Sequence, residues 1–239
     1  ERVALERRMR ETEKIAAVGN LAAGLAHEIA APLNVISGRA ELLLRPGEAT
    51  DRERHLRSII QQIDRITGTV RHLLDYARRR EPRLRPCDLH AVTRGAMEFL
   101  DGELARTRVT WRVEAPEPVP VNADPDQLHQ VLVNLVLNAT QAMEQQDEGG
   151  RAITVTVRRE GAALAVLEVR DTGPGLPEDL LPSLFQPFVT TKPRGTGLGL
   201  VVARSLVEEH GGTLEARNHP EGGAVFRLTL PLSPGAPRG

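Results

Sequence analysis

Two helix-forming stretches separated by a sharp break occupy the first 80 or so residues, and this feature constrains the fold more than any other. In both stretches apolar residues recur at spacings of three, four and seven, which is typical of helices with one apolar face. Arg45-Pro46-Gly47 ends the first helix, and Thr50-Asp51-Arg52-Glu53 is a capping-box pattern that begins the second. The apolar positions are Leu21, Leu25, Ile29, Ile36 and Leu43, then Leu56, Ile59, Ile60, Ile63, Ile66, Val70, Leu73, Leu74 and Ala77.

A short turn between two such helices predicts an antiparallel helical hairpin. One hairpin cannot bury both apolar stripes, so we expect two copies to pair as a homodimer with a four-helix bundle. We place this hairpin domain at residues 19–82 and expect residues 1–18 to form an incoming helix or linker.

After Glu81-Pro82 the pattern changes to short strands that alternate with helices, which predicts an α+β two-layer sandwich over residues 83–239. Residues 89–105 and 126–145 are predicted to be helical. The expected strands are Val109–Val113, Ile153–Arg158, Leu164–Arg170, Thr213–Arg217 and Ala224–Leu230.

The composition is that of a soluble globular protein, with 26% charged and 40% hydrophobic residues in 239. A formal net charge of −1 gives no global field that favours nucleic acid or an anionic membrane. The single cysteine, Cys87, excludes an intrachain disulfide and a cysteine-based zinc site, and it fits a reducing compartment. No run of about 18 apolar residues occurs, so we expect no membrane span in this fragment. The chain starts without Met inside a charged helical pattern, so we expect a cytoplasmic fragment whose sensor part lies upstream.

Asn134 and Asn138 lie four residues apart in the predicted helix 126–145, so their side chains share one face. A carboxamide oxygen is a hard, neutral ligand that suits Mg²⁺ already held by nucleotide phosphates. Taken alone, the pair is more simply interpreted as two amides on a helix surface.

Two glycine segments follow. The carboxylate of Asp171, in Asp171-Thr172-Gly173-Pro174-Gly175, can accept a hydrogen bond from the exocyclic amine of adenine, and the glycines let the base approach the backbone. Gly195-Thr196-Gly197-Leu198-Gly199 precedes an apolar helical run, so its backbone N–H groups can converge on phosphate oxygens at a helix N-terminus. By itself the first segment is more often a turn, and the second matches neither the Rossmann nor the Walker pattern.

The stretch Leu184–Arg194 between the glycine segments has weak periodicity, and we interpret it as a mobile lid. Phe185 and Phe188 would anchor its base, while Lys192 or Arg194 would reach the terminal phosphates. For either basic residue alone, a solvated basic loop is an equally good interpretation.

The order of these elements resembles the ATP-binding domain shared by histidine kinases, gyrase, the Hsp90 chaperones and MutL. Over roughly residues 86–231 it is similar to the asparagine, glycine and phenylalanine boxes of the histidine kinases. The resemblance implies that the chain binds ATP and Mg²⁺, that Asn138 is the magnesium ligand with Asn134 beside it, and that Asp171 contacts adenine. The other implied nucleotide contacts are Gly173, Gly175, Phe188, Lys192, Arg194, Gly195, Thr196, Gly197, Leu198 and Gly199.

His27 lies in Leu25-Ala26-His27-Glu28-Ile29-Ala30-Ala31-Pro32-Leu33, within the first predicted helix. A neutral imidazole nitrogen is a nucleophile near pH 7, and Glu28 can hydrogen-bond the other ring nitrogen or take its proton. Pro32 leaves the Glu28 carbonyl without its helical partner, so we expect a bend just after the histidine. Without the second domain, His27 would be interpreted as an ordinary exposed residue.

This segment closely resembles the phosphoacceptor box of the commonest histidine kinase class, over about residues 15–80. The resemblance implies that His27 is phosphorylated from ATP and that the phosphoryl group passes to an aspartate of a response-regulator receiver domain. Four residues after the histidine this class usually has Thr or Asn, which helps position water for dephosphorylating the partner. Ala31 forms no such hydrogen bond, so we expect kinase and phosphotransfer activity with weak phosphatase activity.

Three other classes of function fit the sequence less well. An ATP-hydrolysing clamp of the gyrase, Hsp90 and MutL type is disfavoured because Asn134, which cannot take a proton, stands where those proteins carry a water-activating glutamate. A catalytically inert nucleotide-binding dimer is disfavoured because every box is intact. A serine kinase with the same ATP-binding fold would not need a helical histidine box.

Overall fold

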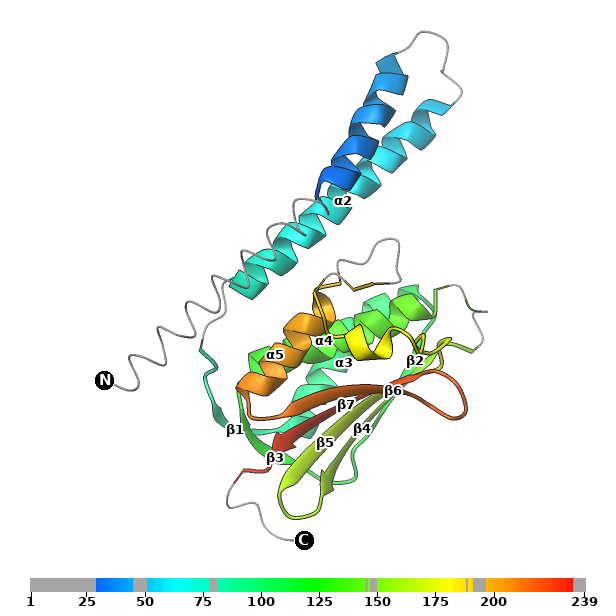
Figure 1. The fold of residues 1–239 in the computed structure, drawn as a ribbon. Helices are drawn as coiled ribbons and strands as arrows, with labels where there is room; N and C mark the ends of the chain where they lie inside the picture. Colours follow the sequence, from blue (N-terminus) through cyan, green and yellow to red (C-terminus); the bar gives the residue numbers. More distant parts are fainter. Residues whose placement is uncertain are drawn as a thin grey trace, which may run out of the picture. The chain divides into compact units, whose positions relative to one another are not determined.

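The computed structural model describes residues 29–44, 51–77, 81–144, 146, 150–187, 189–190 and 197–233. The chain forms two units, a helical one and an α/β one, whose elements are shown in Figure 1. The expected incoming helix at residues 1–18 lies outside the described residues.

The helical unit contains a helix over residues 29–44 and α2, which spans Arg52–Ala77. The first helix runs through Pro32, and the predicted break at Arg45-Pro46-Gly47 lies outside the described residues. The guanidinium of Arg39 lies 3.1 Å from Nδ1 of the buried His55, which ties the two helices together. The helical N-terminal region expected from the sequence is confirmed.

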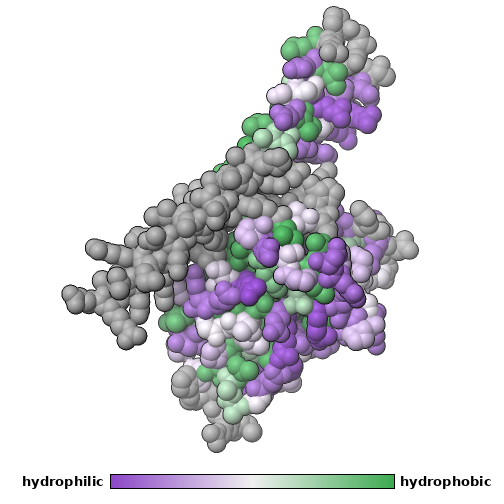
Figure 2. All heavy atoms as spheres, viewed as in Figure 1, coloured by the Kyte–Doolittle hydropathy of each residue, from purple (hydrophilic) through white to green (hydrophobic). Residues whose placement is uncertain are grey.

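Apolar side chains remain exposed along this unit, and Figure 2 shows hydrophobic residues on its surface. Leu56, Ile60 and Ile63 follow one another at spacings of four and three along α2, and each is about half exposed, at 47%, 57% and 49%. This spacing places them on one helix face. The hairpin by itself therefore leaves an apolar stripe in contact with water.

The α/β unit is built on a sheet in which, among the described residues, five strands pair in the order β2-β4-β5-β7-β6. Neighbouring strands are antiparallel except for β2, which runs parallel to β4. The strands are β2 (Thr110–Glu114), β4 (Ala152–Glu160), β5 (Leu164–Asp171), β6 (Thr213–Asn218) and β7 (Ala224–Pro231). All five expected strands are confirmed with small shifts at their ends.

Helices α3 (Leu89–Arg106), α4 (Pro125–Ala142) and α5 (Gly199–Glu209) cover one face of this sheet (Figure 1). The core lies between the two layers, where alternate residues of β4, such as Val155 and Val157, are fully buried. Leu135 and Val136 of α4 are also fully buried, because they lie on its sheet-facing side. The observed layers confirm the expected two-layer architecture.

A small antiparallel sheet was not expected from the sequence. It consists of β1 (Arg85–Asp88) paired with β3 (Pro120–Ala123), with Cys87 opposite Val121. Both strands have only four residues and contain proline, so they show no clear alternation of apolar and polar residues from which a strand could be predicted. Because the two strands are antiparallel, Asp88 before α3 lies opposite Pro120, and Ala123 before α4 lies opposite Arg85.

Asp124 joins three parts of the α/β unit. Its carboxylate accepts hydrogen bonds from the N–H of Asp126 at the start of α4 (3.0 Å) and from the N–H of Arg83 (2.9 Å). Its own N–H donates to Nε2 of His210 (2.9 Å), and the buried His210 donates from Nδ1 to the Leu206 carbonyl (2.7 Å). The entering chain, the start of α4 and the end of α5 are thus fixed to one another.

The pKa of Asp124 lies below its ordinary value of 3.8. Burial alone would raise this pKa. The backbone N–H groups that donate hydrogen bonds to the carboxylate stabilise its charged form, and this effect outweighs that of burial.

Within the part of the chain that the structure describes, no helix is both long enough and apolar enough to cross a membrane.

Candidate functional site

Asn134 and Asn138 lie on one half-buried face of α4, as their spacing predicts. Nδ2 of Asn134 donates to the carbonyl of Gly199 at 3.3 Å. A Cβ placed on Gly199 would lie 3.8 Å from Nδ2 of Asn138. Both asparagines therefore lie against the first residue of α5, where the second glycine segment ends. The structure brings together two motifs that lie some 60 residues apart in the sequence.

Asp171 is the last residue of β5 and is 2% exposed. Its Oδ1 accepts hydrogen bonds from the N–H of Gly173 (2.8 Å) and the N–H of Ala224 (3.1 Å). A Cβ on Gly173 would lie 2.8 Å from this same oxygen, so no larger residue fits there without a shift. The carboxylate is held firmly at the end of its strand, where an incoming hydrogen-bond donor could be recognised.

The loop after Asp171 depends on residues that the sequence interpretation missed. Gly175 has φ of +83°, and a Cβ on it would lie 2.8 Å from Oδ1 of Asn218. Asn218 binds the backbone of Leu176 in both directions, accepting from its N–H at 2.7 Å and donating to its carbonyl at 2.8 Å. Gly222-Gly223, which follows Asn218 in the sequence, favours a turn between two strands and gives no sign of a contact with this loop.

The segment that leads from the first glycine segment towards the second begins with a short 3₁₀ turn, η3 (Leu181–Ser183). The guanidinium of Arg204 on α5 lies 5.2 Å from the centre of the Phe185 ring, and it also pairs with Glu208 at 2.9 Å. A cation over an aromatic ring is attracted by its electron-rich face. Phe185 thus attaches the start of this segment to α5, and the role of the segment as a lid stays a prediction.

Several predicted site residues lie outside the described residues, so their positions stay predictions. They are His27, Glu28, Phe188, Lys192, Arg194, Gly195 and Thr196. Of the remaining glycine segment, Gly197 has φ of +64° and Leu198 is buried.

The residues that are brought together fit a nucleotide with a divalent cation. Amide oxygens on α4 are hard, neutral ligands for Mg²⁺. The N-terminus of α5 beside them presents backbone N–H groups and the positive end of a helix dipole, which favour phosphate. The buried carboxylate of Asp171 is an acceptor for an amine, as adenine carries. The α4 amides and the start of α5 therefore offer adjacent groups for a metal ion and a phosphate chain, and Asp171 offers an acceptor for a base.

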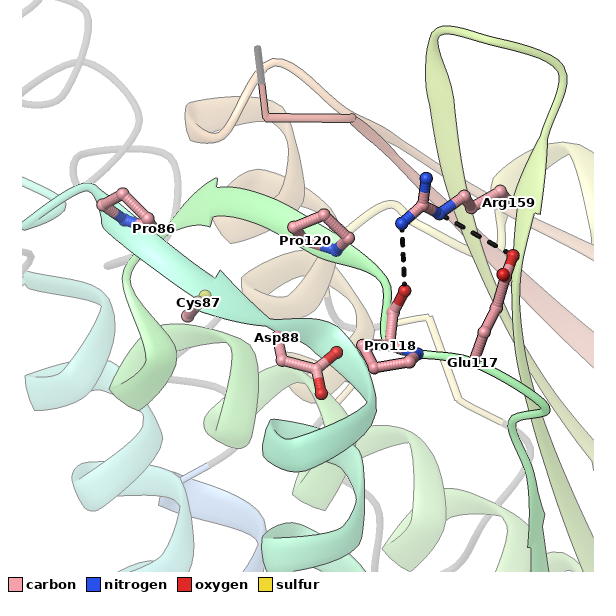
Figure 3. Close-up of a pocket in the computed structure, with 7 residues that line it drawn as sticks. All are labelled: Pro86, Cys87, Asp88, Glu117, Pro118, Pro120 and Arg159. Atoms are coloured by element: carbon pink, nitrogen blue, oxygen red, sulfur yellow. Dashed lines mark hydrogen bonds and ion pairs between the residues drawn. The ribbon is translucent and has the colours of Figure 1, made fainter. Parts of the chain in front are cut away.

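A separate pocket of about 530 Å³ lies at the small sheet and is lined by Pro86, Cys87, Asp88, Glu117, Pro118, Pro120 and Arg159 (Figure 3). Arg159 donates to the Pro118 carbonyl at 3.3 Å and lies 3.7 Å from the Glu117 carboxylate. Burial raises the pKa of the Cys87 thiol, so the reactive thiolate is disfavoured at neutral pH. None of the predicted site residues lines this pocket.

Comparisons with known proteins agree with this geometry. Residues 123–234 match the family model described as histidine kinase-, DNA gyrase B- and HSP90-like ATPase. Residues 17–82 match the model described as the His Kinase A (phospho-acceptor) domain.

The chain is 36% identical over 231 residues to the sensor histidine kinase ZraS of Escherichia coli K12, covering 96% of this chain and 49% of that protein. It is 38% identical over 218 residues to the sensor protein kinase PilS of Pseudomonas aeruginosa, covering 91% of this chain and 41% of that protein. The chain spans about half the length of the curated relatives it matches.

Among solved structures, the catalytic domain of histidine kinase ThkA is 30% identical with a TM-score of 0.56, covering 64% of this chain and 97% of that one. ThkA in complex with the response regulator protein TrrA is 27% identical with a TM-score of 0.76, covering 96% of this chain and 66% of that one.

The fold and the site define an ATP-binding domain of the histidine kinase, gyrase and Hsp90 type, preceded by a phosphoacceptor helical region. The chain belongs to the sensor histidine kinases of two-component signalling. The resemblance found in the sequence is confirmed.

Proposed function

We propose that this chain binds ATP with Mg²⁺, transfers the terminal phosphoryl group to His27, and passes it on to an aspartate of a response-regulator receiver domain. The proposal rests mainly on one observation: Asn134 and Asn138 lie against Gly199, the first residue of α5. Two relatives support it, because ShkA was solved in complex with AMPPNP and ThkA in complex with a response regulator.

In this proposal each end of the nucleotide has its own partners. The Asp171 carboxylate accepts a hydrogen bond from the adenine amine, and the lack of side chains at Gly173 and Gly175 lets the base approach the backbone. Asn138 would hold Mg²⁺ with Asn134 beside it, and the ion would supply positive charge that neutralises the phosphates. The N-terminus of α5, together with Lys192 and Arg194, adds positive potential near the terminal phosphate.

The chemical step is an in-line displacement at the γ-phosphorus. A neutral imidazole nitrogen of His27 forms the N–P bond while the bond from phosphorus to the β,γ-bridging oxygen breaks, and ADP leaves. The proton on the other ring nitrogen becomes acidic as the ring gains charge, and Glu28 can accept it or hydrogen-bond to it. Catalysis rests mostly on holding the two reactants in line.

We also propose that the hairpin, placed at residues 19–82, forms a homodimer, while residues 83–239 form the ATP-binding domain. The exposed stripe formed by Leu56, Ile60 and Ile63 supports this, because a second hairpin would remove it from water.

Weak phosphatase activity is a further part of the proposal. Ala31 is an exposed residue of the helix over residues 29–44, and its methyl group cannot hold a water molecule by a hydrogen bond. We expect Ala31→Thr to increase the rate at which the phosphorylated partner loses phosphate. The expectation would be contradicted if wild type dephosphorylated its partner as fast as Thr-bearing relatives do and Ala31→Thr left this rate unchanged.

The decisive experiment incubates the chain with γ-labelled ATP and follows the label on the protein. We expect a label that is stable in base and labile in acid, that disappears in His27→Ala, and that persists in the matched control His90→Ala. Labelled phosphate in solution without labelled protein would instead indicate an ATP-hydrolysing clamp. Nucleotide binding without either product would indicate an inert scaffold.

A further inference from the structure

The side chain of Asn218 forms a two-way connection with the loop that carries the first glycine segment. Asn218 is the last residue of β6, and its amide both accepts from and donates to the backbone of Leu176, at 2.7 Å and 2.8 Å. Both distances are short for such bonds, and together they satisfy the N–H and the carbonyl of one residue. Leu176 directly follows Gly175, so the connection fixes the far end of the loop.

The turn between β6 and β7 holds the near end of the same loop. The N–H of Ala224 donates to Oδ1 of Asp171 at 3.1 Å. Gly223 has φ of +84°, and any Cβ on it would overlap the Asp171 carbonyl oxygen. The N–H of His219 donates to the Gly223 carbonyl at 2.9 Å and closes the turn. One hairpin therefore fixes both Asp171 and Leu176, and the loop between them spans a set distance.

We propose that Asn218 is a positioning residue that sets the affinity for the nucleotide and the preference for adenine over guanine. The inference deepens the proposed function and rests on it. Asn218 acts through Leu176, whose backbone it holds in register with the Asp171 carboxylate. Adenine carries an amine donor where guanine carries a carbonyl, so a fixed carboxylate accepts from the first and repels the second. Discrimination of this kind requires the recognising groups to stay in place, because a loop that can shift relieves the mismatch.

If Asn218 only stabilised the fold, its variants would lower the melting temperature. Asn218 is exposed and contributes nothing to the buried core, so water can replace its hydrogen bonds when the side chain is removed. We therefore expect the folded state to persist in variants of Asn218, with the change confined to nucleotide recognition.

The test compares Asn218→Ala, which removes both hydrogen bonds, with Asn218→Asp, which keeps the acceptor for the Leu176 N–H but places a second acceptor against its carbonyl. Asn122→Ala is the matched control, because Asn122 is also an exposed strand asparagine but lies in the small sheet. The measurements are initial rates of autophosphorylation against ATP concentration, competition by GTP, and the melting temperature.

We expect both Asn218 variants to raise the KM for ATP by about tenfold, which corresponds to the loss of one to two hydrogen bonds, with kcat within about twofold of wild type. The ratio of ATP to GTP affinity should fall, and the melting temperature should match that of Asn122→Ala. An unchanged KM, an unchanged nucleotide preference, or a parallel loss of kcat and melting temperature would overturn the inference. In each of these cases the wild-type chain still phosphorylates itself, so the proposed function stands. If the wild type failed to bind ATP, both the proposed function and this inference would be overturned.

Discussion

Two neighbouring glycines in the turn between β6 and β7 allow the effect of a steric contact on stability to be measured separately from that of backbone conformation. Gly222 and Gly223 have φ of +96° and +84°, so an alanine is strained at either position. They differ in their surroundings, since a Cβ on Gly222 meets nothing within 4 Å, whereas one on Gly223 would overlap the Asp171 carbonyl oxygen. We therefore expect Gly223→Ala to be the more destabilising change.

The magnitudes follow from these two effects. A left-handed conformation costs an L-residue about 1–2 kcal/mol, which should be the whole effect of Gly222→Ala. Gly223→Ala adds a backbone displacement at the end of β5, and overpacking of this kind costs about 1–3 kcal/mol more. The total of about 2–5 kcal/mol stays below the stability of a typical domain, so the variant should still fold.

Urea unfolding followed by tryptophan fluorescence is the suitable assay. The single tryptophan, Trp111, lies on β2 with its Nε1 hydrogen-bonded to Asp101 at 2.8 Å, so its signal reports on the α/β unit. The free energy of unfolding should fall in the order wild type, Gly222→Ala, Gly223→Ala. Equal losses in the two variants would show that the close approach of Gly223 to Asp171 has no energetic effect, and the reasoning about this loop would be refuted.

Three further predictions concern the site, the start of α4 and the hairpin. Asp171→Asn should weaken ATP binding by about tenfold or more, measured by competition with a fluorescent nucleotide, because an amide nitrogen would face the adenine amine; unchanged affinity would exclude the proposed contact. The folded-state pKa of Asp124 is lowered, so its stabilising charge is present above pH about 4 and is lost as the pH falls below that value. The difference in the free energy of unfolding between wild type and Asp124→Asn should therefore become smaller as the pH is lowered from about 6 to about 3. A difference in urea unfolding that stays constant over this range would contradict the prediction. Ile60→Glu should convert the expected dimer to monomer in sedimentation, because it places a charge in the apolar stripe; a dimer that persists would locate the contact elsewhere.

Local sequence patterns predicted the elements that positioned the site. The spacing of Asn134 and Asn138 placed them on one helix face, and period-two alternation predicted the strands β4 and β5. Asp124 followed by Pro125 is a helix start that could have been predicted, yet the helix was expected one residue later. The proposed roles of Asn138 and Asp171 remain predictions, supported by the geometry around them.

Long-range pairing accounts for what the sequence did not reveal. Strand β1 has four residues including Pro86, and it forms only because β3, over 30 residues later, supplies its partner. Asn218 contacts Leu176 across 42 residues, and nothing in its immediate sequence marks it as part of a nucleotide loop. Such contacts depend on the assembled sheet order, in which β6 lies at the edge opposite β2.

The hydrogen bond from the Arg83 N–H to Asp124 links the backbone just before β1 to the start of α4. The same carboxylate caps the helix on which Asn134 lies ten residues further on, a rise of about 15 Å. A displacement of the backbone at Arg83 would act on the Asp124 carboxylate, and through it on the start of the helix that carries both Asn134 and Asn138.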